Sequence, residues 1–146
     1  KISHKGKEIE MLSSTYQLEL NAPREVVWQA ITDCRQYHWR SEIATIQILE
    51  ENLRFMEIEQ SGFTTIFDIV AQEKPSYYEL KLENKRFTGC WQGKLAEETA
   101  GKTRLTMTYR LKMKRPWLQV IAFFCFPLRR MQKRYGEALR QYVEND

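Results

Sequence analysis

Residues 116–143 have the sequence PWLQVIAFFCFPLRRMQKRYGEALRQYV, and we expect the rest of the chain to fold around them. A dense apolar run from Trp117 to Phe126 opens it, and a basic amphipathic segment follows. The run is too short to cross a membrane as a helix, which takes about 20 residues. We predict a C-terminal helix over residues 116–143, kinked near Pro127. Beyond the kink, apolar residues recur every three or four positions, as on a helix with one buried face; they are Leu128, Met131, Tyr135, Leu139 and Tyr142.

Most of the sequence before this helix has the alternation of apolar and polar residues that is typical of strands. One strand is expected at residues 15–20, and six more follow from Ile43 onward, at a spacing of about ten residues. The short turns between them favour antiparallel pairing. One face of such a sheet needs an apolar cover, and the C-terminal segment is the only one long enough to supply it.

A helix is expected directly after the first strand. Pro23 suits the first helical position, where its missing N–H costs nothing, and the charge of Glu25 meets the positive end of the helix. A second short helix is expected over residues 34–39, and a loose arm over residues 1–13. We therefore predict a single α+β domain spanning residues 1–146.

Positive charge collects in the C-terminal part of the sequence. The net charge is +4, and no acidic residue lies between Glu98 and Glu137. This window forms either a solvated basic face or a surface for an anionic partner such as a membrane. Nucleic acid is not favoured as a partner, because no recognition motif accompanies the basic residues.

The three cysteines lie far apart and have no CxxC spacing. Their odd number favours reduced thiols and a cytoplasmic location, and no signal peptide is visible. With only two histidines, His4 and His38, a zinc site is not expected. No nucleophilic triad or phosphate-binding loop can be assembled either, so we expect no metal, cofactor or catalytic residue.

Two motifs and the order of elements resemble the SRPBCC superfamily, also called START-like or helix-grip. The first motif is Ala22-Pro23-Arg24-Glu25-Val26-Val27-Trp28, and the second, Tyr37-His38-Trp39-Arg40-Ser41-Glu42, is similar to a variant in uncharacterised bacterial members of the polyketide cyclase/dehydrase-like branch. The resemblance implies a curved antiparallel sheet of about seven strands around a long C-terminal helix, with two short helices after the first strand. It also implies a hydrophobic cavity between sheet and helix, but no single chemistry.

Gly89 and Gly93 flank Trp91 on the strand face that we expect to point inward. Their missing side chains leave space or permit sharp sheet curvature, although an ordinary filled core is the alternative. The residues expected to bind a ligand in the cavity are Trp39, Phe55, Phe67, Ile69, Trp91, Met107, Tyr109, Leu118, Ile121, Ala122 and Cys125.

Several charged residues near the expected cavity have both a functional and a structural interpretation. His38 could hold a ligand and Arg40 could close on an anionic one, but a loop hydrogen bond and a surface ion pair are the simpler roles. Glu57, Glu59 and Asp68 are placed on the solvent side. A shift of one residue in strand register would turn Glu57 and Glu59 inward.

Three functions remain open. We favour a non-enzymatic module that binds a hydrophobic or amphipathic small molecule, lipid- or polyketide-like. The second is an aromatase/cyclase-type enzyme, which needs an inward acid or base. The third is a membrane-surface or protein-interaction module that uses the basic helix, with homodimerisation as a competitor. In either case the contact surface would use exposed aromatic residues among Trp117, Phe123, Phe124 and Phe126.

Overall fold

Seven strands form one antiparallel sheet in a computed structural model that describes residues 11–115, 117 and 127–145. Their order across the sheet is β1-β7-β6-β5-β4-β3-β2, so the first strand pairs with the last and the others follow in sequence. The strands are β1 (Met11–Leu20), β2 (Ile43–Glu50), β3 (Arg54–Glu59), β4 (Thr64–Glu73), β5 (Tyr77–Glu83), β6 (Phe87–Thr99) and β7 (Lys102–Met113).

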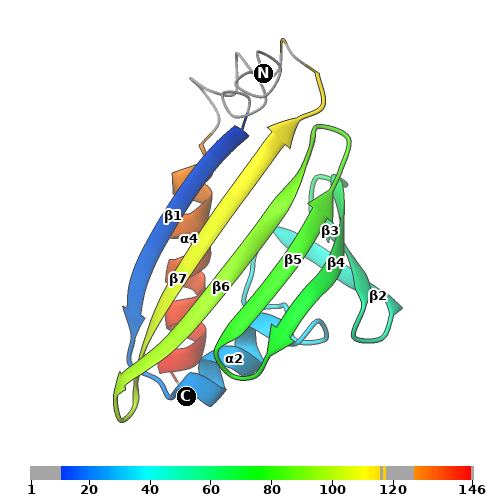
Figure 1. The fold of residues 1–146 in the computed structure, drawn as a ribbon. Coiled ribbons are helices and arrows are strands. Elements are labelled where there is room, and N and C mark those ends of the chain that lie inside the picture. The colour runs from blue at the N-terminus through cyan, green and yellow to red at the C-terminus, as the bar shows by residue number, and fades with distance from the viewer. Residues whose placement is uncertain (1–10, 116, 118–126, 146) are drawn as a thin grey trace.

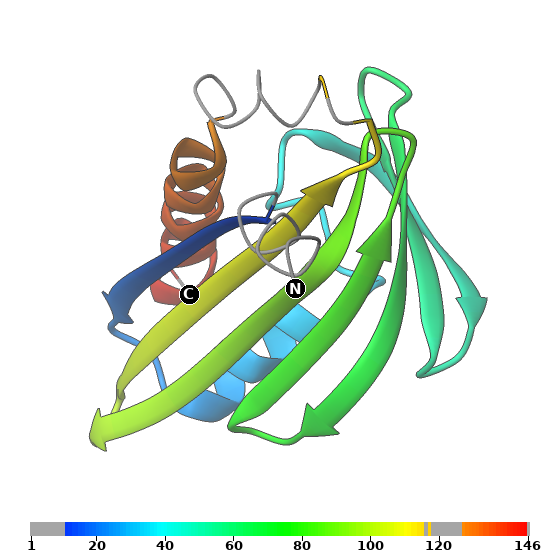
Figure 2. The same cartoon turned by 45° about the horizontal axis from the view of Figure 1, so that its top comes forward.

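Two helices lie on the same, concave face of this sheet, α2 (Arg24–Thr32) and α4 (Leu128–Glu144). Figure 1 shows α4 running beside β1 and β7, and Figure 2 shows α2 beneath the lower part of the sheet. The predicted α+β helix-grip fold is thereby confirmed. No helix in the described ranges is long and apolar enough to cross a membrane.

The structure differs from the sequence prediction at three places in the chain. Strand β1 begins at Met11, so the last residues of the expected arm belong to the sheet. The prediction of a second short helix is wrong, because residues 34–39 form turns and irregular backbone. A register shift between Ile69 and Ala71 moves Ala71 off the inner face that Phe67 shares. Helix α4 begins directly after Pro127. The predicted kink depends on the segment before it, and most of that segment lies outside the described residues.

The buried face of α4 is rotated relative to the predicted stripe. Met131 and Tyr142 remain 38% and 39% exposed. The reason is a close approach between α4 and β1 at Gly136, where a Cβ would lie 3.1 Å from Leu18 Cδ1. The buried positions are Leu128, Gln132, Gly136, Leu139 and Val143.

A buried glutamine joins α4 to the sheet. Gln132 Nε2 donates to the carbonyl oxygens of Ser14 on β1 and Met107 on β7, at 2.9 and 3.2 Å. Its Oε1 accepts a hydrogen bond of 2.7 Å from the Ser14 hydroxyl. Because a buried polar group costs free energy unless it is paired, these three bonds fix both the position and the rotation of α4.

We predict that Gln132→Leu lowers the free energy of unfolding by about 1–3 kcal/mol, since the substitution removes three hydrogen bonds that a buried side chain makes to β1 and β7. Urea unfolding followed by circular dichroism measures the change. Gln141→Leu is the matched control on the exposed side of α4, and it should change stability by at most about 0.5 kcal/mol. Equal effects of the two substitutions would contradict a clamp at Gln132.

Candidate functional site

Two adjoining cavities lie between the concave face of the sheet and the helices. The inner chamber has a volume of about 60 Å³, and Cys34, Trp39 and Trp91 are among its lining residues. The outer chamber has a volume of about 320 Å³, and Glu59, Phe63 and Phe87 are among its lining residues. Five residues line both chambers and so form the wall between them: Arg40, Glu57, Phe67, Tyr109 and Tyr135.

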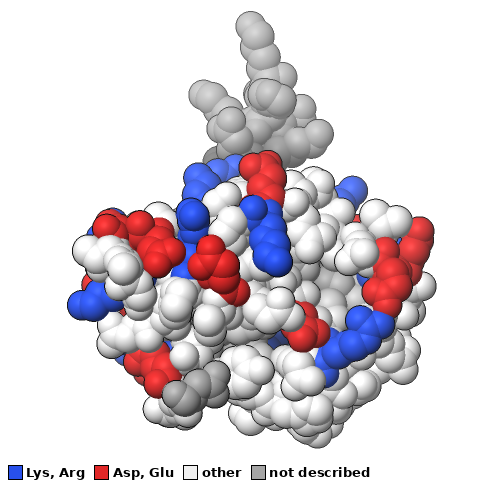
Figure 3. Space-filling model, turned by 90° about the horizontal axis from the view of Figure 1, so that it is seen from below, with Lys and Arg blue, Asp and Glu red and all other residues white. Residues whose placement is uncertain are grey.

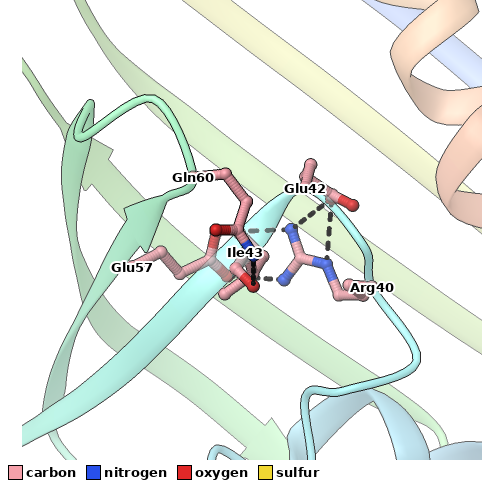
Figure 4. Close-up of polar contacts among 5 residues, drawn as sticks. All are labelled: Arg40, Glu42, Ile43, Glu57 and Gln60. Carbon is pink, nitrogen blue, oxygen red and sulfur yellow. Dashed lines mark hydrogen bonds and ion pairs between the residues drawn. The ribbon is translucent and has the colours of Figure 1, made fainter.

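An ion pair between Arg40 and Glu57 occupies the centre of this wall. Arg40 Nη1 donates to Glu57 Oε2 at 2.7 Å, and the guanidinium also donates to Glu42 at 3.2 Å (Figure 4). The side chains of Arg40 and Glu57 are only 16% and 14% exposed. Burial disfavours the charged guanidinium, but the nearby carboxylates outweigh this effect and raise the pKa of Arg40. The wall therefore keeps a fixed positive group between two carboxylates.

Strand register brings both Glu57 and Glu59 to the inner face, so their predicted solvent exposure is wrong. Phe55 pairs with Phe67, their rings stack at 5.0 Å, and alternation along β3 then points Glu57 and Glu59 the same way. The adjacent apolar residues Phe55 and Met56 made the face of this strand ambiguous in the sequence. Asp68 lies on the outer face as predicted, paired with an arginine.

Glu59 differs from its neighbour Glu57 because no described side chain forms an ion pair or hydrogen bond with its carboxylate. Burial raises the pKa of Glu59, and the negative charges of Glu57 and Glu42 raise it further. Arg86 and Arg40 act in the opposite direction. Glu59 is therefore a carboxyl group in the outer chamber that can exchange a proton closer to neutral pH than an ordinary glutamate.

Three tyrosine hydroxyls lie in the chambers without a hydrogen-bond partner among the described residues. Tyr78 lines the inner chamber, and Tyr109 and Tyr135 line both. Burial raises the pKa of Tyr109 to about 12 and raises those of Tyr78 and Tyr135 as well. All three hydroxyls consequently stay protonated at neutral pH and can donate to an oxygen atom of a bound molecule.

Trp39 connects the irregular segment after α2 to helix α4. Its ring packs edge-on against Tyr135 at 5.3 Å and stacks on Tyr142 at 5.6 Å, while its indole N–H donates to the Gln36 carbonyl at 3.0 Å. The next residue is Arg40, whose guanidinium carbon lies 5.1 Å from the centre of the Tyr135 ring. Contacts of Trp39 thus hold the segment that supplies the central cation.

The predicted ligand-binding residues divide into three groups. Trp39, Phe55 and Trp91 line the inner chamber, and Phe67 and Tyr109 line both chambers. Ile69 instead lines a third, polar cavity beside α2, and Met107 is buried in the core and lines neither chamber. The other four lie outside the described residues: Leu118, Ile121, Ala122 and Cys125.

The two glycines beside Trp91 serve packing and leave no open space. A Cβ at Gly93 would lie 2.6 Å from the Trp91 ring, and one at Gly89 would lie 2.1 Å from the Arg110 carbonyl oxygen. Gly93 therefore lets the indole lie flat along β6, and Gly89 permits close approach of β7. The space that we predicted there from the sequence is filled by the protein itself.

Several residues that line the chambers were not predicted to do so from the sequence. Tyr135 was assigned only to the apolar stripe of α4, and Cys34 was not singled out. Burial raises the pKa of the Cys34 thiol to about 11, so this residue is a poor nucleophile at neutral pH. His38 is exposed, stacks on Tyr37 at 4.6 Å and lines neither chamber.

These features define a helix-grip protein with two adjoining chambers. Aromatic side chains line both chambers, and an ion pair lies in the wall between them. Residues 11–144 match the family described as polyketide cyclase / dehydrase and lipid transport, and the chain belongs to that family. A search among curated proteins gives no match.

Solved structures with the same fold have diverse descriptions. A START superfamily protein from Mycobacterium smegmatis is 18% identical, with a TM-score of 0.72 over 92% of this chain and 97% of its own. The Zhui aromatase/cyclase from Streptomyces sp. R1128 is 13% identical, with a TM-score of 0.73 over 92% and 94%. Norcoclaurine synthase from Thalictrum is 6% identical, with a TM-score of 0.71 over 92% and 95%. At these identities the likeness establishes the fold alone.

We predict that Arg40→Met lowers the free energy of unfolding by about 3 kcal/mol, because it leaves the Glu57 carboxylate buried without a partner. The double variant Arg40→Met/Glu57→Leu should lose less, since it removes both charges. Urea unfolding of the single and double variants measures the coupling.

Arg54→Met is the control for this prediction, because Arg54 forms an exposed pair with Asp68 at 2.7 Å. It should cost no more than about 1 kcal/mol. A double variant less stable than Arg40→Met would show that the buried pair is not the source of the loss.

Proposed function

We propose that the protein binds an amphipathic small molecule, lipid- or polyketide-like, in the outer chamber, with the polar end of the molecule against the dividing wall. The observation that carries this proposal is the set of unpartnered hydroxyls on Tyr109 and Tyr135. No described residue accepts a hydrogen bond from either hydroxyl, so both are free to donate to an oxygen atom of a bound molecule. The chamber volume of about 320 Å³ also lies within the range of small-molecule pockets.

The outer chamber offers an apolar surface to the body of such a ligand. Phe63, Phe67, Leu82 and Phe87 line it on the sheet side. A ligand that buries about 200 Å² of apolar surface there would gain about 5 kcal/mol, before the entropic cost of binding. The inner chamber, at about 60 Å³, has room only for a small group or a few waters.

We predict that Tyr109→Phe and Tyr135→Phe each weaken binding about 2- to 10-fold, which corresponds to one hydrogen bond. Binding is measured by fluorescence titration with 1-anilinonaphthalene-8-sulfonate, an amphipathic aromatic probe with oxygen acceptors. Tyr77→Phe is the control, because the Tyr77 hydroxyl bonds to Glu79 at 2.6 Å and lines neither chamber. If the parent protein does not bind the probe, or all variants bind it equally, the ligand does not place its polar end against Tyr109 and Tyr135.

Native mass spectrometry gives an independent test of the same proposal. Purified protein should carry a co-purifying small molecule that is released on denaturation and is identified after extraction. Filling the mouth of the outer chamber by Met131→Trp should reduce its occupancy, and Gln141→Trp on the exposed face of α4 should not. Equal occupancy in the two variants would place the molecule elsewhere.

An aromatase/cyclase-type activity is the second candidate, and a specific observation favours it. The chambers contain a candidate base, the Glu59 carboxylate, and a fixed cation, the Arg40 guanidinium, whereas a purely apolar lining would have ruled out this chemistry. Glu59 would remove a proton next to a carbonyl group, and Arg40 would stabilise the oxyanion that forms. The reaction needs no cofactor.

A synthetic poly-β-ketone thioester tests this second candidate. Cyclised product should form with the parent protein, and Glu59→Gln should lower its rate at least 100-fold while binding of the fluorescent probe persists. Glu98→Gln, on the exposed end of β6, is the control. If the parent yields no more cyclised product than buffer does, the protein acts as a binding module only.

A further inference from the structure

We propose that the end of the molecule at which the outer chamber opens docks onto an anionic lipid bilayer, and that the ligand passes there between bilayer and chamber. The proposal rests on the proposed function in one respect, namely that the outer chamber holds a ligand. The docking itself rests on charge and exposed apolar side chains at this end.

The first half of α4 carries cations without partners. Arg130, Lys133 and Arg134 are all exposed, and none forms an ion pair with a described residue. Their spacing of three and four residues places them on one side of the helix. In the second half of α4 the pattern changes, because Arg140 approaches Glu137 at 3.8 Å. Uncompensated positive charge is thus concentrated near the beginning of α4.

The mouth of the outer chamber opens among these cations. Its exposed lining residues are Ser61, Arg86, Met131 and Arg134. The beginning of α4, the end of β7 and the turn between β5 and β6 all lie at the upper end of the molecule in Figures 1 and 2. A ligand that leaves the chamber through this mouth therefore emerges at the basic end.

The turn that carries Arg86 is held rigidly. Asn84 Oδ1 accepts hydrogen bonds from the backbone N–H groups of Arg86 and Phe87 at 2.9 and 3.0 Å, and its Nδ2 donates to Thr65 on β4 at 3.2 Å. The Arg86 guanidinium lies 4.8 Å from the centre of the Phe63 ring, and no described carboxylate pairs with it. Arg86 is thus a positioned cation at the mouth, without a charge partner in the described part of the chain.

Large apolar side chains are exposed beside these charges. Trp117 follows β7 and is 57% exposed, and Arg115, two residues earlier, is exposed without an ion-pair partner in the described ranges. Met131 is exposed on α4 between Arg130 and Lys133. Indole and thioether groups next to cations suit the boundary between lipid head groups and acyl chains, and this combination favours a bilayer over a purely polar polyanion.

The opposite end of the molecule has no such excess of charge. Figure 3 shows that face hollowed, with basic and acidic side chains intermixed. The polar cavity beside α2 is lined there by three acidic and three basic residues, and Arg35 pairs with Glu51. The six charged residues are Asp33, Glu50, Glu51, Arg35, Arg54 and Lys74. Attraction to an anionic surface would therefore orient the molecule with its chamber mouth toward the lipid.

The test uses the full chain and vesicles of phosphatidylcholine with or without about 30% phosphatidylglycerol. Exposed basic residues are attracted to an anionic bilayer and salt screens this attraction, so the parent protein should float with anionic vesicles at low salt and dissociate at high salt. Arg130→Glu/Lys133→Glu should weaken vesicle binding at least 10-fold. Neither residue lines the outer chamber.

Lys94→Glu/Lys102→Glu is the matched control, because it makes the same change in net charge at exposed positions of β6 and β7 away from the mouth. This control should bind vesicles nearly as well as the parent. The proposal is overturned if the parent does not float at low salt, or if both double variants lose binding equally. Binding to duplex DNA without vesicles, or dimerisation through the same residues without vesicles, would also overturn it.

The outcome for docking is separate from the outcome for the chamber. Arg130→Glu/Lys133→Glu should bind the fluorescent probe in solution with the affinity of the parent. A parent that floats with vesicles but binds no probe would refute the ligand chamber and leave the docking surface intact. A parent that binds the probe but does not float would refute the docking surface and leave the ligand chamber intact.

Discussion

The contact between α4 and the β1–β7 side of the sheet is the constraint on which the interior depends. Gln132 bonds to the backbones of both strands, and Gly136 lets the helix approach β1 closely. These contacts hold α4 to one side of the concave face. The inner surface of β3 and β4 is therefore not packed against α4, and the two chambers lie between this surface and the helices.

Polar groups lie among the aromatic side chains in this half of the interior. Arg40 enters from the turn before β2 and meets Glu57 on β3, and the ring of Tyr135 on α4 lies beside the guanidinium. A buried ion pair adds little net stability compared with well-packed apolar residues. Its presence at the boundary between two chambers fits a role in recognition better than a role in holding the fold together. In both proposed functions, the same wall meets the polar part of the molecule that enters.

The same arrangement relates the interior to the outer surface. Met131 and Arg134 line the outer chamber from the beginning of α4, while the exposed neighbours Arg130 and Lys133 do not line it. One helix therefore contributes a wall of the chamber, the rim of its mouth and a charged surface around that rim. The basic residues that appeared in the sequence as a continuous acid-free window have different roles, which depend on the side of the helix that they occupy.

Local patterns in the sequence were enough to predict the sheet, the order of its elements and the C-terminal helix that packs against it. Alternation in β6 and β7 and the three- and four-residue spacing after Pro127 are local patterns, and they follow from strand and helix geometry alone. Phe67, Trp91 and Tyr109 were placed on the correct face for this reason. Local alternation failed where apolar residues are adjacent, as at Phe55 and Met56, or where a bulge intervenes, as between Ile69 and Ala71.

Which polar side chains share the interior depends on long-range packing and could not be predicted from local patterns. The register of β3 against β4 turned Glu57 and Glu59 inward, and the rotation of α4 buried Gln132 in place of Met131. Both depend on pairing between residues far apart in the chain, such as Ser14 with Gln132 and Arg40 with Glu57. The space predicted at Gly89 and Gly93 proved to be filled for the same reason, because free volume depends on how every neighbouring side chain packs and not on the composition of one strand.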